Sequence, residues 1–323
     1  MASFRDIVSQ RRLLLDGSMA TMIRRLALSE EQYRGARLKN HPVSLSGNYD
    51  ILNITAPEII SSIHLQYLEA GADVIETNTF NANELSQRRY HTSEYANEMN
   101  LLAARIARAE ADRFSTQELP RFVAGSIGPS EFSLSVNDAT IPEPEEIGNA
   151  YEHQADALID GGVDLLIIET IYDPMTARAI IEGVGRSIDK HGGDTSLIIS
   201  VTVDNESGRM ASGEKPEEFL ETVERNIRLA AFGLNCCCGP RGLNRTIDLL
   251  AGASPYPIVC YPSAGIPDKD GNYPESPESF VEAIMRMMGD RKPGIIGGCC
   301  GTTPEHIRIL RNSIDQAPLF REI

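Results

Sequence analysis

Hydrophobic positions in this chain form two alternating patterns. Short, nearly continuous apolar runs rich in β-branched residues recur along the sequence, and between them lie longer segments whose apolar residues have helical spacing. Uninterrupted apolar runs are typical of strands buried on both faces of a parallel sheet. We predict eight strands, at residues 12–17, 72–79, 121–128, 163–170, 196–203, 231–237, 256–264 and 294–300. We predict helices at residues 56–69, 99–111, 148–159, 174–188, 216–229, 243–250, 277–288 and 304–314.

Eight alternations of strand and helix favour an α/β fold, namely a single (β/α)8 TIM barrel. We expect it to span residues 1–323 as one domain. A weak internal echo supports the repeat, because residues 71–74 and 162–165 begin alike and both strands end on a Glu-Thr pair. The longer loops at 28–48, 130–146 and 265–278 each follow a predicted strand. They would therefore lie on the barrel face that carries active sites.

Charge and hydropathy exclude several classes of partner. The chain has 46 acidic and 30 basic residues, a net charge of −16, and no Lys/Arg-rich run, which argues against binding to nucleic acid. Its apolar runs are far shorter than the roughly 20 residues that cross a bilayer, so we expect no membrane partner. The first residues do not resemble a secretion signal. We therefore expect a cytoplasmic protein with reduced thiols.

Five of the six cysteines occur in two groups, at 236–238 and at Cys299 and Cys300. These groups end the sixth and eighth predicted strands, whose C-terminal ends meet on one face of a barrel. Three thiolates around Zn²⁺ would leave an open fourth position, as in catalytic zinc sites, and the absence of a C-x-x-C pair disfavours a structural zinc ribbon. Strand alternation places Cys236 and Cys238 on the same face, so the residues alone leave both as candidates.

The residues around the second cysteine group favour a metal or ligand site there. Gly297, Gly298 and Gly301 remove side chains where the backbone would approach a ligand. The segment 302–305, Thr-Thr-Pro-Glu, predicts a capping box from Thr302 to Glu305, with proline just inside a helix. The positive end of that helix would favour thiolate forms of the adjacent cysteines.

Several motifs resemble those of the homocysteine S-methyltransferase family, over residues from about 13 to 314. The sequence contains Asp-Gly-Ser-Met-Ala-Thr-Met at 16–22, Glu-Thr-Asn-Thr-Phe at 76–80, Gly-Ser-Ile-Gly-Pro at 125–129, Gly-Leu-Asn-Cys at 233–236 and Gly-Gly-Cys-Cys-Gly-Thr-Thr-Pro at 297–304. The Thr-Thr-Pro continuation is most similar to the homocysteine-binding module of the cobalamin-dependent methionine synthase branch. The resemblance implies a zinc-bearing barrel that methylates homocysteine.

The resemblance also assigns residues. Cys236, Cys299 and Cys300 match the family's zinc positions, and this match chooses Cys236 over Cys238. Glu169 matches the glutamate expected to hold the substrate ammonium; the alternative is that Glu169 caps the following helix. The remaining substrate-binding candidates are Asp16, Gly17, Thr21, Ser126 and Asn235. The backbone of residues 17–21 and Ser126 is expected near the substrate carboxylate, and Asn235 is expected to orient other groups.

Some positions depart from the family pattern. Ala20 stands where glycine is usual, and Ser263 stands where asparagine is usual. Cys237 and Cys260 are interpreted as core residues, and His306 as a residue on a helix face rather than a metal ligand.

The function has three interpretations, of which the first two differ in the methyl donor. The resemblance implies methylcobalamin, and because a barrel of this size accounts for all 323 residues, we expect the cobalamin on a separate corrinoid protein. A free donor such as S-methylmethionine or betaine is the alternative within the same chemistry. A non-catalytic module that binds zinc or thiols is the alternative of another class.

Overall fold

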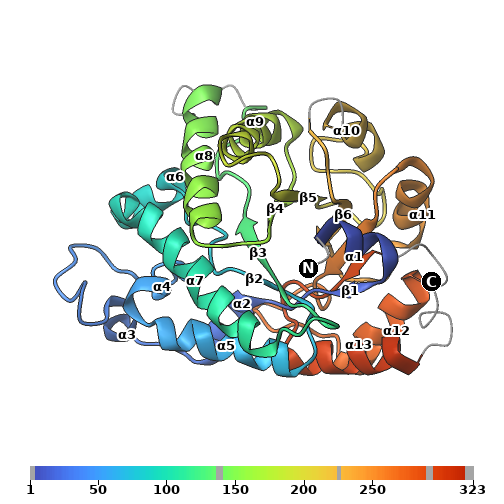
Figure 1. Ribbon diagram of the computed structural model, residues 1–323, viewed down its shortest axis with the longest axis horizontal. Helices are drawn as coiled ribbons and strands as arrows, with labels where there is room; N and C mark the ends of the chain where they lie inside the picture. Colours follow the sequence, from blue (N-terminus) through green and yellow to red (C-terminus); the bar gives the residue numbers. More distant parts are fainter. Residues whose placement is uncertain (1–3, 136–140, 224–226, 289–293, 317–323) are drawn as a thin grey trace.

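The computed structural model describes residues 4–135, 141–223, 227–288 and 294–316 and contains one parallel sheet of eight strands (Figure 1). The strands are β1 (Leu13–Leu14), β2 (Val74–Glu76), β3 (Phe122–Ile127), β4 (Leu165–Ile171), β5 (Ser196–Val201), β6 (Ala231–Cys236), β7 (Ile258–Pro262) and β8 (Ile295–Ile296). Their order in the sheet is β1-β8-β7-β6-β5-β4-β3-β2. A parallel bridge between Leu15 and Val74 joins the two ends of this order. The predicted (β/α)8 barrel is therefore confirmed.

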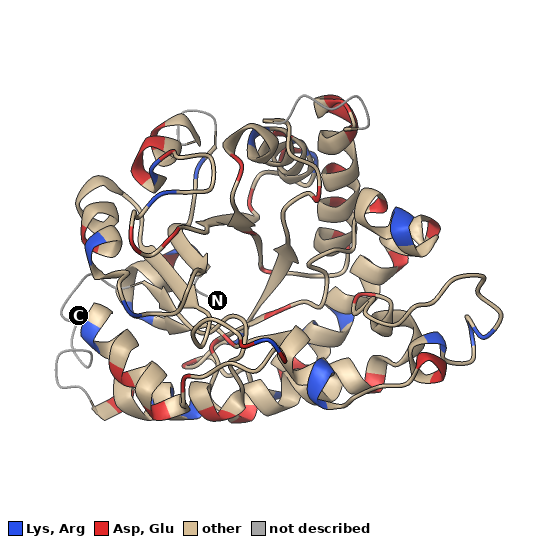
Figure 2. Cartoon of the chain, turned by 180° about the vertical axis from the view of Figure 1, so that it is seen from behind, with Lys and Arg blue, Asp and Glu red and all other residues tan. Residues whose placement is uncertain are grey.

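Helices surround the barrel, as Figure 1 shows. They are α1 (Phe4–Gln10), α2 (Met19–Arg25), α3 (Glu30–Arg34), α4 (Leu52–Thr55), α5 (Pro57–Glu69), α6 (Glu84–Gln87), α7 (Ala96–Phe114), α8 (Pro144–Asp160), α9 (Pro174–Lys190), α10 (Pro216–Val223), α11 (Asn244–Ala253), α12 (Pro277–Met288) and α13 (Pro304–Gln316), with 3-10 turns at Arg88–Tyr90 and Ser93–Tyr95. Within the described residues, none of these helices combines the length and apolar character needed to cross a bilayer. Acidic and basic residues are interspersed along the outer helices (Figure 2), where pairs such as Arg186 and Glu152 form ion pairs.

Two packed layers explain why the strand sequences are apolar at successive positions. Leu165 and Ile167 of β4 belong to a cluster inside the barrel, whereas Leu166 and Ile168 pack with the surrounding helices. Side chains alternate across a strand, so both faces of each strand are buried. The short helix α1, which we did not predict, adds Phe4 to the inner cluster. The ring of Phe4 meets the ring of Phe122 edge-on at 5.2 Å.

Several predicted boundaries were wrong. Strands β1, β2 and β8 have only two or three residues, because the polypeptide leaves the ladder early to form the loops above the barrel. The helix predicted at 216–229 ends at Val223, and residues 224–226 of that prediction lie outside the described residues. Within the loop predicted at 28–48, residues Glu30–Arg34 form helix α3.

The predicted capping box at Thr302 was wrong by one position. Helix α13 begins at Pro304, and the N–H of Thr303 donates to Nδ1 of His306 at 3.2 Å. His306, rather than Glu305, therefore supplies the side chain that reaches back to the start of the helix. Its ring is buried and lies edge-on to Phe280, with the centroids 5.4 Å apart.

Three arginines converge on Asp73 just before β2. The Asp73 side chain is 2% exposed and pairs with Arg121 at 2.7 Å, Arg311 at 2.5 Å and Arg11 at 3.3 Å. One of its oxygens also accepts the N–H of Leu14 at 2.9 Å. This carboxylate therefore ties β1, β3 and α13 together at the N-terminal end of the strands.

We expect Asp73→Asn to lower the free energy of unfolding by about 3 kcal/mol, because removal of one partner leaves buried charge uncompensated. Urea denaturation measures the change. The control is Glu282→Gln, whose ion pair with Arg286 is solvent-exposed and contributes about 0–1 kcal/mol. Equal effects of the two substitutions would show that the Asp73 cluster has no special role in stability.

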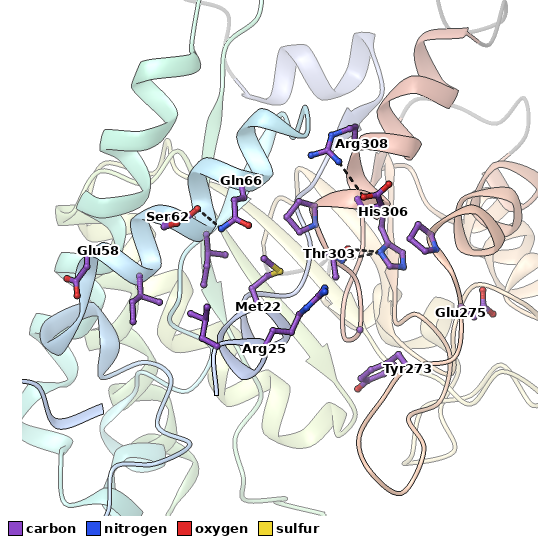
Figure 3. Close-up of a pocket in the computed structure, with 17 residues that line it drawn as sticks. Met22, Arg25, Glu58, Ser62, Gln66, Tyr273, Glu275, Thr303, His306 and Arg308 are labelled. Atoms are coloured by element: carbon purple, nitrogen blue, oxygen red, sulfur yellow. Dashed lines mark hydrogen bonds and ion pairs between the residues drawn. The ribbon is translucent and has the colours of Figure 1, made fainter. Parts of the chain in front are cut away.

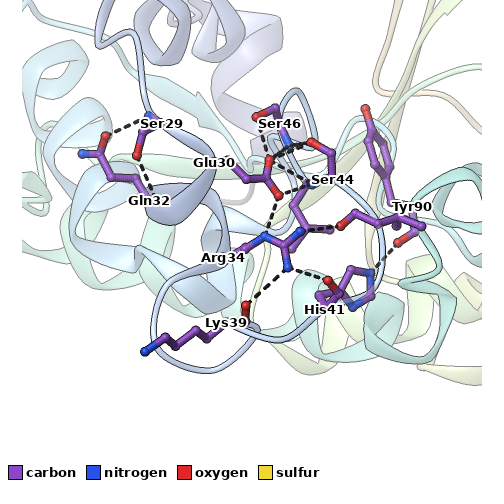
Figure 4. Close-up of polar contacts among 11 residues, drawn as sticks. Ser29, Glu30, Gln32, Arg34, Lys39, His41, Ser44, Ser46 and Tyr90 are labelled. Atoms are coloured by element: carbon purple, nitrogen blue, oxygen red, sulfur yellow. Dashed lines mark hydrogen bonds and ion pairs between the residues drawn. The ribbon is translucent and has the colours of Figure 1, made fainter.

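The loop after α3 is organised around a single carboxylate, that of Glu30 in α3 (Figure 4). Glu30 accepts hydrogen bonds from the hydroxyls of Ser44 and Ser46, from the N–H of Leu45 and from the guanidinium of Arg34. Partial desolvation opposes ionisation, but these hydrogen bonds lower the pKa of Glu30 to about 2. The carboxylate therefore stabilises the loop most where it is ionised.

We expect Glu30→Gln to speed tryptic cleavage after the exposed Lys39 several-fold at pH 7, because the loop loses a charged acceptor. In the wild type, the lowered pKa of Glu30 means that its stabilising effect is complete above pH 4.5 and is lost as the pH falls towards 2. Glu31→Gln, on the same helix, is the matched control. Unchanged cleavage in Glu30→Gln would contradict this role.

Candidate active site

Three cysteine sulfurs meet above the C-terminal ends of β6 and β8. The Sγ atom of Cys236 lies 3.5 Å from that of Cys299 and 3.9 Å from that of Cys300, and the latter two are 3.9 Å apart. Tetrahedral zinc with Zn–S bonds of about 2.3 Å requires sulfur separations of about 3.8 Å. The three thiols therefore fit a zinc ion, and they form the only such group of metal-ligating side chains among the described residues.

The backbone around the sulfurs is held in uncommon conformations. Cys236 has φ +59° and Cys237 has φ +50°, the left-handed region that side chains disfavour. The end of β7 fixes both cysteine groups, since the N–H of Ser263 donates to the carbonyl of Cys236 at 2.7 Å. The N–H of Cys299 donates to the carbonyl of Pro262 at 2.9 Å. The strand between the two groups thus sets their separation.

Glycines allow the second group to approach its neighbours. A Cβ on Gly298 would lie 2.5 Å from Thr302, and a Cβ on Gly301 would lie 2.2 Å from the ring of Tyr273. Gly301 also has φ +83°. The predicted need for glycine on both sides of Cys299 and Cys300 therefore has a steric cause.

Hydrogen bonding within the cluster shifts the pKa values of its thiols in opposite directions. Hydrogen bonds from Cys236 and Cys299 lower the pKa of Cys300, whereas the pKa of Cys299 is raised by its hydrogen bonds to the other two sulfurs and by burial. A metal ion that binds all three sulfurs releases the protons that remain on the thiols.

The structure separates Cys236 from the two cysteines that follow it. The thiol of Cys237 donates to the carbonyl of Asn235 at 3.1 Å, and burial raises its pKa to about 11. Cys238 is exposed, and neither residue belongs to the metal-ligating group. Cys260 is fully buried, as a core residue should be.

A cavity of about 300 Å³ opens beside the sulfurs. Of the predicted site residues, Gly17, Ser126 and Glu169 line this cavity together with the three clustered cysteines. Asp16, Thr21 and Asn235 are absent from its lining. They form hydrogen bonds to other protein groups near it. The loop residues Tyr49, Asp50 and Phe80 also line it.

Glu169 lies in this cavity as the centre of a hydrogen-bond network. One carboxylate oxygen accepts from the hydroxyl of Ser126 at 2.6 Å, and the other accepts from the side-chain N–H of Asn235 at 3.3 Å and from the hydroxyl of Tyr261 at 3.4 Å. Burial raises the pKa of Glu169 to about 7 despite these donors. The alternative that Glu169 caps the next helix was wrong, because Asp173 caps α9 by accepting the N–H of Met175.

Asn235 positions the end of β4. Thr170 has φ +58°, which is strained for a β-branched residue, and the β4–β5 register shifts nearby. The Asn235 side chain accepts the N–H of Thr170 at 2.8 Å and donates to its hydroxyl at 2.7 Å. Asn235 thereby links the carboxylate of Glu169 to the end of β6, where Cys236 belongs to the sulfur cluster.

The first loop is fastened to the second cysteine group. The hydroxyl of Thr21 accepts the N–H of Gly301 at 2.9 Å, and a Cβ on Gly17 would lie 2.7 Å from Thr302. Asp16 is 2% exposed and accepts the N–H of Glu76 at 3.0 Å. Asp16 and Thr21 therefore act on other protein groups in this structure.

The predicted site set omitted two carboxylates of the cavity lining, Asp50 and Glu76. Glu76, at the end of β2, lines the cavity next to the predicted residues. The sequence contained its signal, because Glu76-Thr77 repeats the Glu169-Thr170 ending of β4. We gave weight only to the second of these two pairs.

A larger cavity of about 910 Å³ lies between α2, α5 and α13 (Figure 3). It includes Arg25, Arg308, Glu58 and Glu305, so its charges are mixed. None of the clustered cysteines lines it. Size alone therefore does not identify the reactive site, and the smaller cavity holds the chemistry.

Comparisons with known proteins agree with this geometry. The family model "Homocysteine S-methyltransferase" matches residues 13–314. The metallated form of the homocysteine methyltransferase MmuM from Escherichia coli has a similar fold, with a TM-score of 0.74, 22% identity, and coverage of 96% of this chain and 99% of that chain. The oxidized form of that protein gives a TM-score of 0.72 at 21% identity, covering 95% of this chain and 97% of that one. The chain belongs to the homocysteine S-methyltransferase family.

Proposed function

We propose that this protein is a zinc enzyme that transfers a methyl group to the thiol of homocysteine and forms methionine. The observation that carries the proposal is the cluster of three thiols, spaced for tetrahedral zinc, on the wall of a cavity that also contains Glu169. Zn²⁺, when bound, deprotonates a coordinated thiol and so supplies a nucleophile at neutral pH.

The residues of this chain divide the remaining work. Cys236, Cys299 and Cys300 would hold the metal, and the carboxylate of Glu169 would pair with the substrate ammonium. Ser126 and Asn235 hold that carboxylate in place through their hydrogen bonds. The backbone of residues 17–21, where Ser18 caps α2, would face the substrate carboxylate. The substrate is thus oriented with its sulfur towards the cysteines.

We further propose methylcobalamin on a separate corrinoid protein as the methyl donor. The motif from Gly297 to Pro304 resembles the methionine synthase branch and supports this choice. The cavity of about 300 Å³ is at the small end of ligand pockets, so a corrin ring would remain outside and present its methyl group at the mouth. Phe80 is partly exposed and lines this cavity.

The test asks whether the zinc-loaded protein consumes methylcobalamin in a homocysteine-dependent reaction. Cobalamin absorbance monitors the loss of methylcobalamin, and mass spectrometry detects the methionine formed. We expect loss only when both protein and homocysteine are present. Methionine formed from S-methylmethionine or betaine, but not from free or protein-bound methylcobalamin, would contradict the donor. Binding of zinc and homocysteine without turnover by any donor would favour the non-catalytic alternative.

A further inference from the structure

The substrate cavity contains carboxylates and lacks a basic side chain. Glu76, Glu169 and Asp50 line it, the buried Asp16 accepts the backbone N–H of Glu76, and no Lys, Arg or His occurs among the lining residues in the described parts of the chain. The pKa of each of these carboxyls is raised, first by burial; the charge of Glu169 also raises the pKa of Asp16 and Glu76. Asp16, Glu76 and Glu169 are therefore close enough to affect one another, and no basic side chain lines the cavity beside them.

Hydrogen bonding distinguishes Glu169 from the other two carboxylates. Both oxygens of Glu169 have donors from the protein, as described above. In contrast, Oδ1 of Asp16 and Oε1 of Glu76 are buried without a hydrogen-bond partner among the described residues. A buried carboxylate oxygen without a donor is unfavourable unless a ligand supplies one. Of these two residues only Glu76 lines the cavity, so its Oε1 is the acceptor available to a bound molecule.

The chain also fixes the position of Glu76. Its backbone N–H donates to Oδ2 of Asp16 at 3.0 Å, so the carboxylate of Asp16 holds the backbone of Glu76. Glu76 pairs with Ala124 in the ladder between β2 and β3, and Ser126, two residues further along β3, donates to Glu169. The ends of β2, β3 and β4 therefore hold Glu76 and Glu169 on the same cavity.

We propose that Glu76 is a specificity-determining residue that accepts an N–H of the substrate's α-ammonium, together with Glu169. An ammonium group has three N–H donors, more than Glu169 alone would use. Asp16 adds negative potential from beneath and holds the backbone of Glu76. The ammonium lowers the pKa of the carboxyls that it joins, so the cluster ionises as the substrate binds. The inference rests on the proposed function, since it names the group of homocysteine that this carboxylate recognises.

The test compares homocysteine with 4-mercaptobutyrate, which has the same thiol and carboxylate but no amino group. Calorimetry on the zinc-loaded protein measures both affinities in the wild type, in Glu76→Gln and in Glu84→Gln, an exposed control. We expect Glu76→Gln to weaken the binding of homocysteine about 10- to 100-fold, which is the range for loss of a hydrogen bond to a charged group. Its affinity for 4-mercaptobutyrate should change less than threefold.

Two results would overturn the inference. Equal weakening of both ligands would show that Glu76 maintains the cavity rather than recognises the amino group, and unchanged homocysteine affinity would show that it does neither. Zinc content, measured on each variant, separates these results from metal loss. A wild-type protein that binds neither ligand would instead refute the proposed function, so the two failures are distinguishable.

Discussion

Replacement of Cys299 by alanine is expected to abolish both zinc retention and methionine formation. The sulfur of Cys299 forms one corner of the triangle of sulfurs, 3.5 Å from that of Cys236 and 3.9 Å from that of Cys300. Its loss would leave two thiolates, and a zinc site with two protein ligands is far weaker than one with three. We expect less than one tenth of the wild-type zinc after dialysis against a mild chelator, measured by atomic emission, and turnover below detection.

The control for this variant is Cys238→Ala. Cys238 is exposed and outside the sulfur cluster, although it lies only two residues from Cys236. Its replacement should change zinc content and turnover less than twofold. A Cys299→Ala protein with full zinc and full activity would refute the metal assignment. Loss of zinc in Cys238→Ala as well would show that the cluster has been assigned to the wrong cysteines.

Replacement of Glu169 by glutamine is expected to weaken the binding of homocysteine about 100-fold while zinc remains bound. Glutamine keeps the size of the side chain but removes the charge that pairs with the ammonium, and this variant leaves Ser126 and Tyr261 without a charged acceptor. Calorimetry measures affinity, and metal analysis measures zinc. Unchanged affinity in a zinc-loaded Glu169→Gln protein would contradict the role of this carboxylate.

The raised pKa of Glu169 predicts a pH dependence that the variant should lose. Burial raises this pKa to about 7, so the carboxyl is protonated below that pH and cannot pair fully with an ammonium. Methionine, the proposed product, has the ammonium but no thiol, so its binding is free of the titration of a substrate thiol. We expect methionine affinity to fall as the pH decreases from 8 to 6 in the wild type, and Glu169→Gln to lose the part of this fall that comes from Glu169.

The barrel was predictable because its strands are buried on both faces. Apolar runs such as Leu165 to Ile168 leave little choice of structure, and their alternation with amphipathic helices gives the topology. The lengths of β1, β2 and β8 were not predictable, because the segments that follow them bond to one another through residues distant in sequence, as Gly298 does to Asp16 and Ser18 does to Thr302. The role of α1 likewise depends on contact between Phe4 and Phe122, which no local pattern contains.

The position of a site residue was predictable where the residue ends a strand. The direction of its side chain was less predictable where several hydrogen-bond partners are within reach. Cys236, Cys299 and Cys300 converge because parallel strand ends share one face of the barrel. The direction of the Asp16, Thr21 and Asn235 side chains depends on hydrogen bonds to residues distant in sequence, such as that from Gly301 to Thr21. Glu76 was missed although it ends a strand and opens one of the motifs that resemble the family, because no role was assigned to its carboxylate.

The most direct test of thiol activation by zinc is X-ray absorption at the zinc edge, with and without homocysteine. We predict three sulfur ligands in the zinc-loaded protein, from Cys236, Cys299 and Cys300, and four after homocysteine is added. A sulfur count that stays at three under saturating homocysteine would contradict the claim that the substrate thiol is activated on the metal.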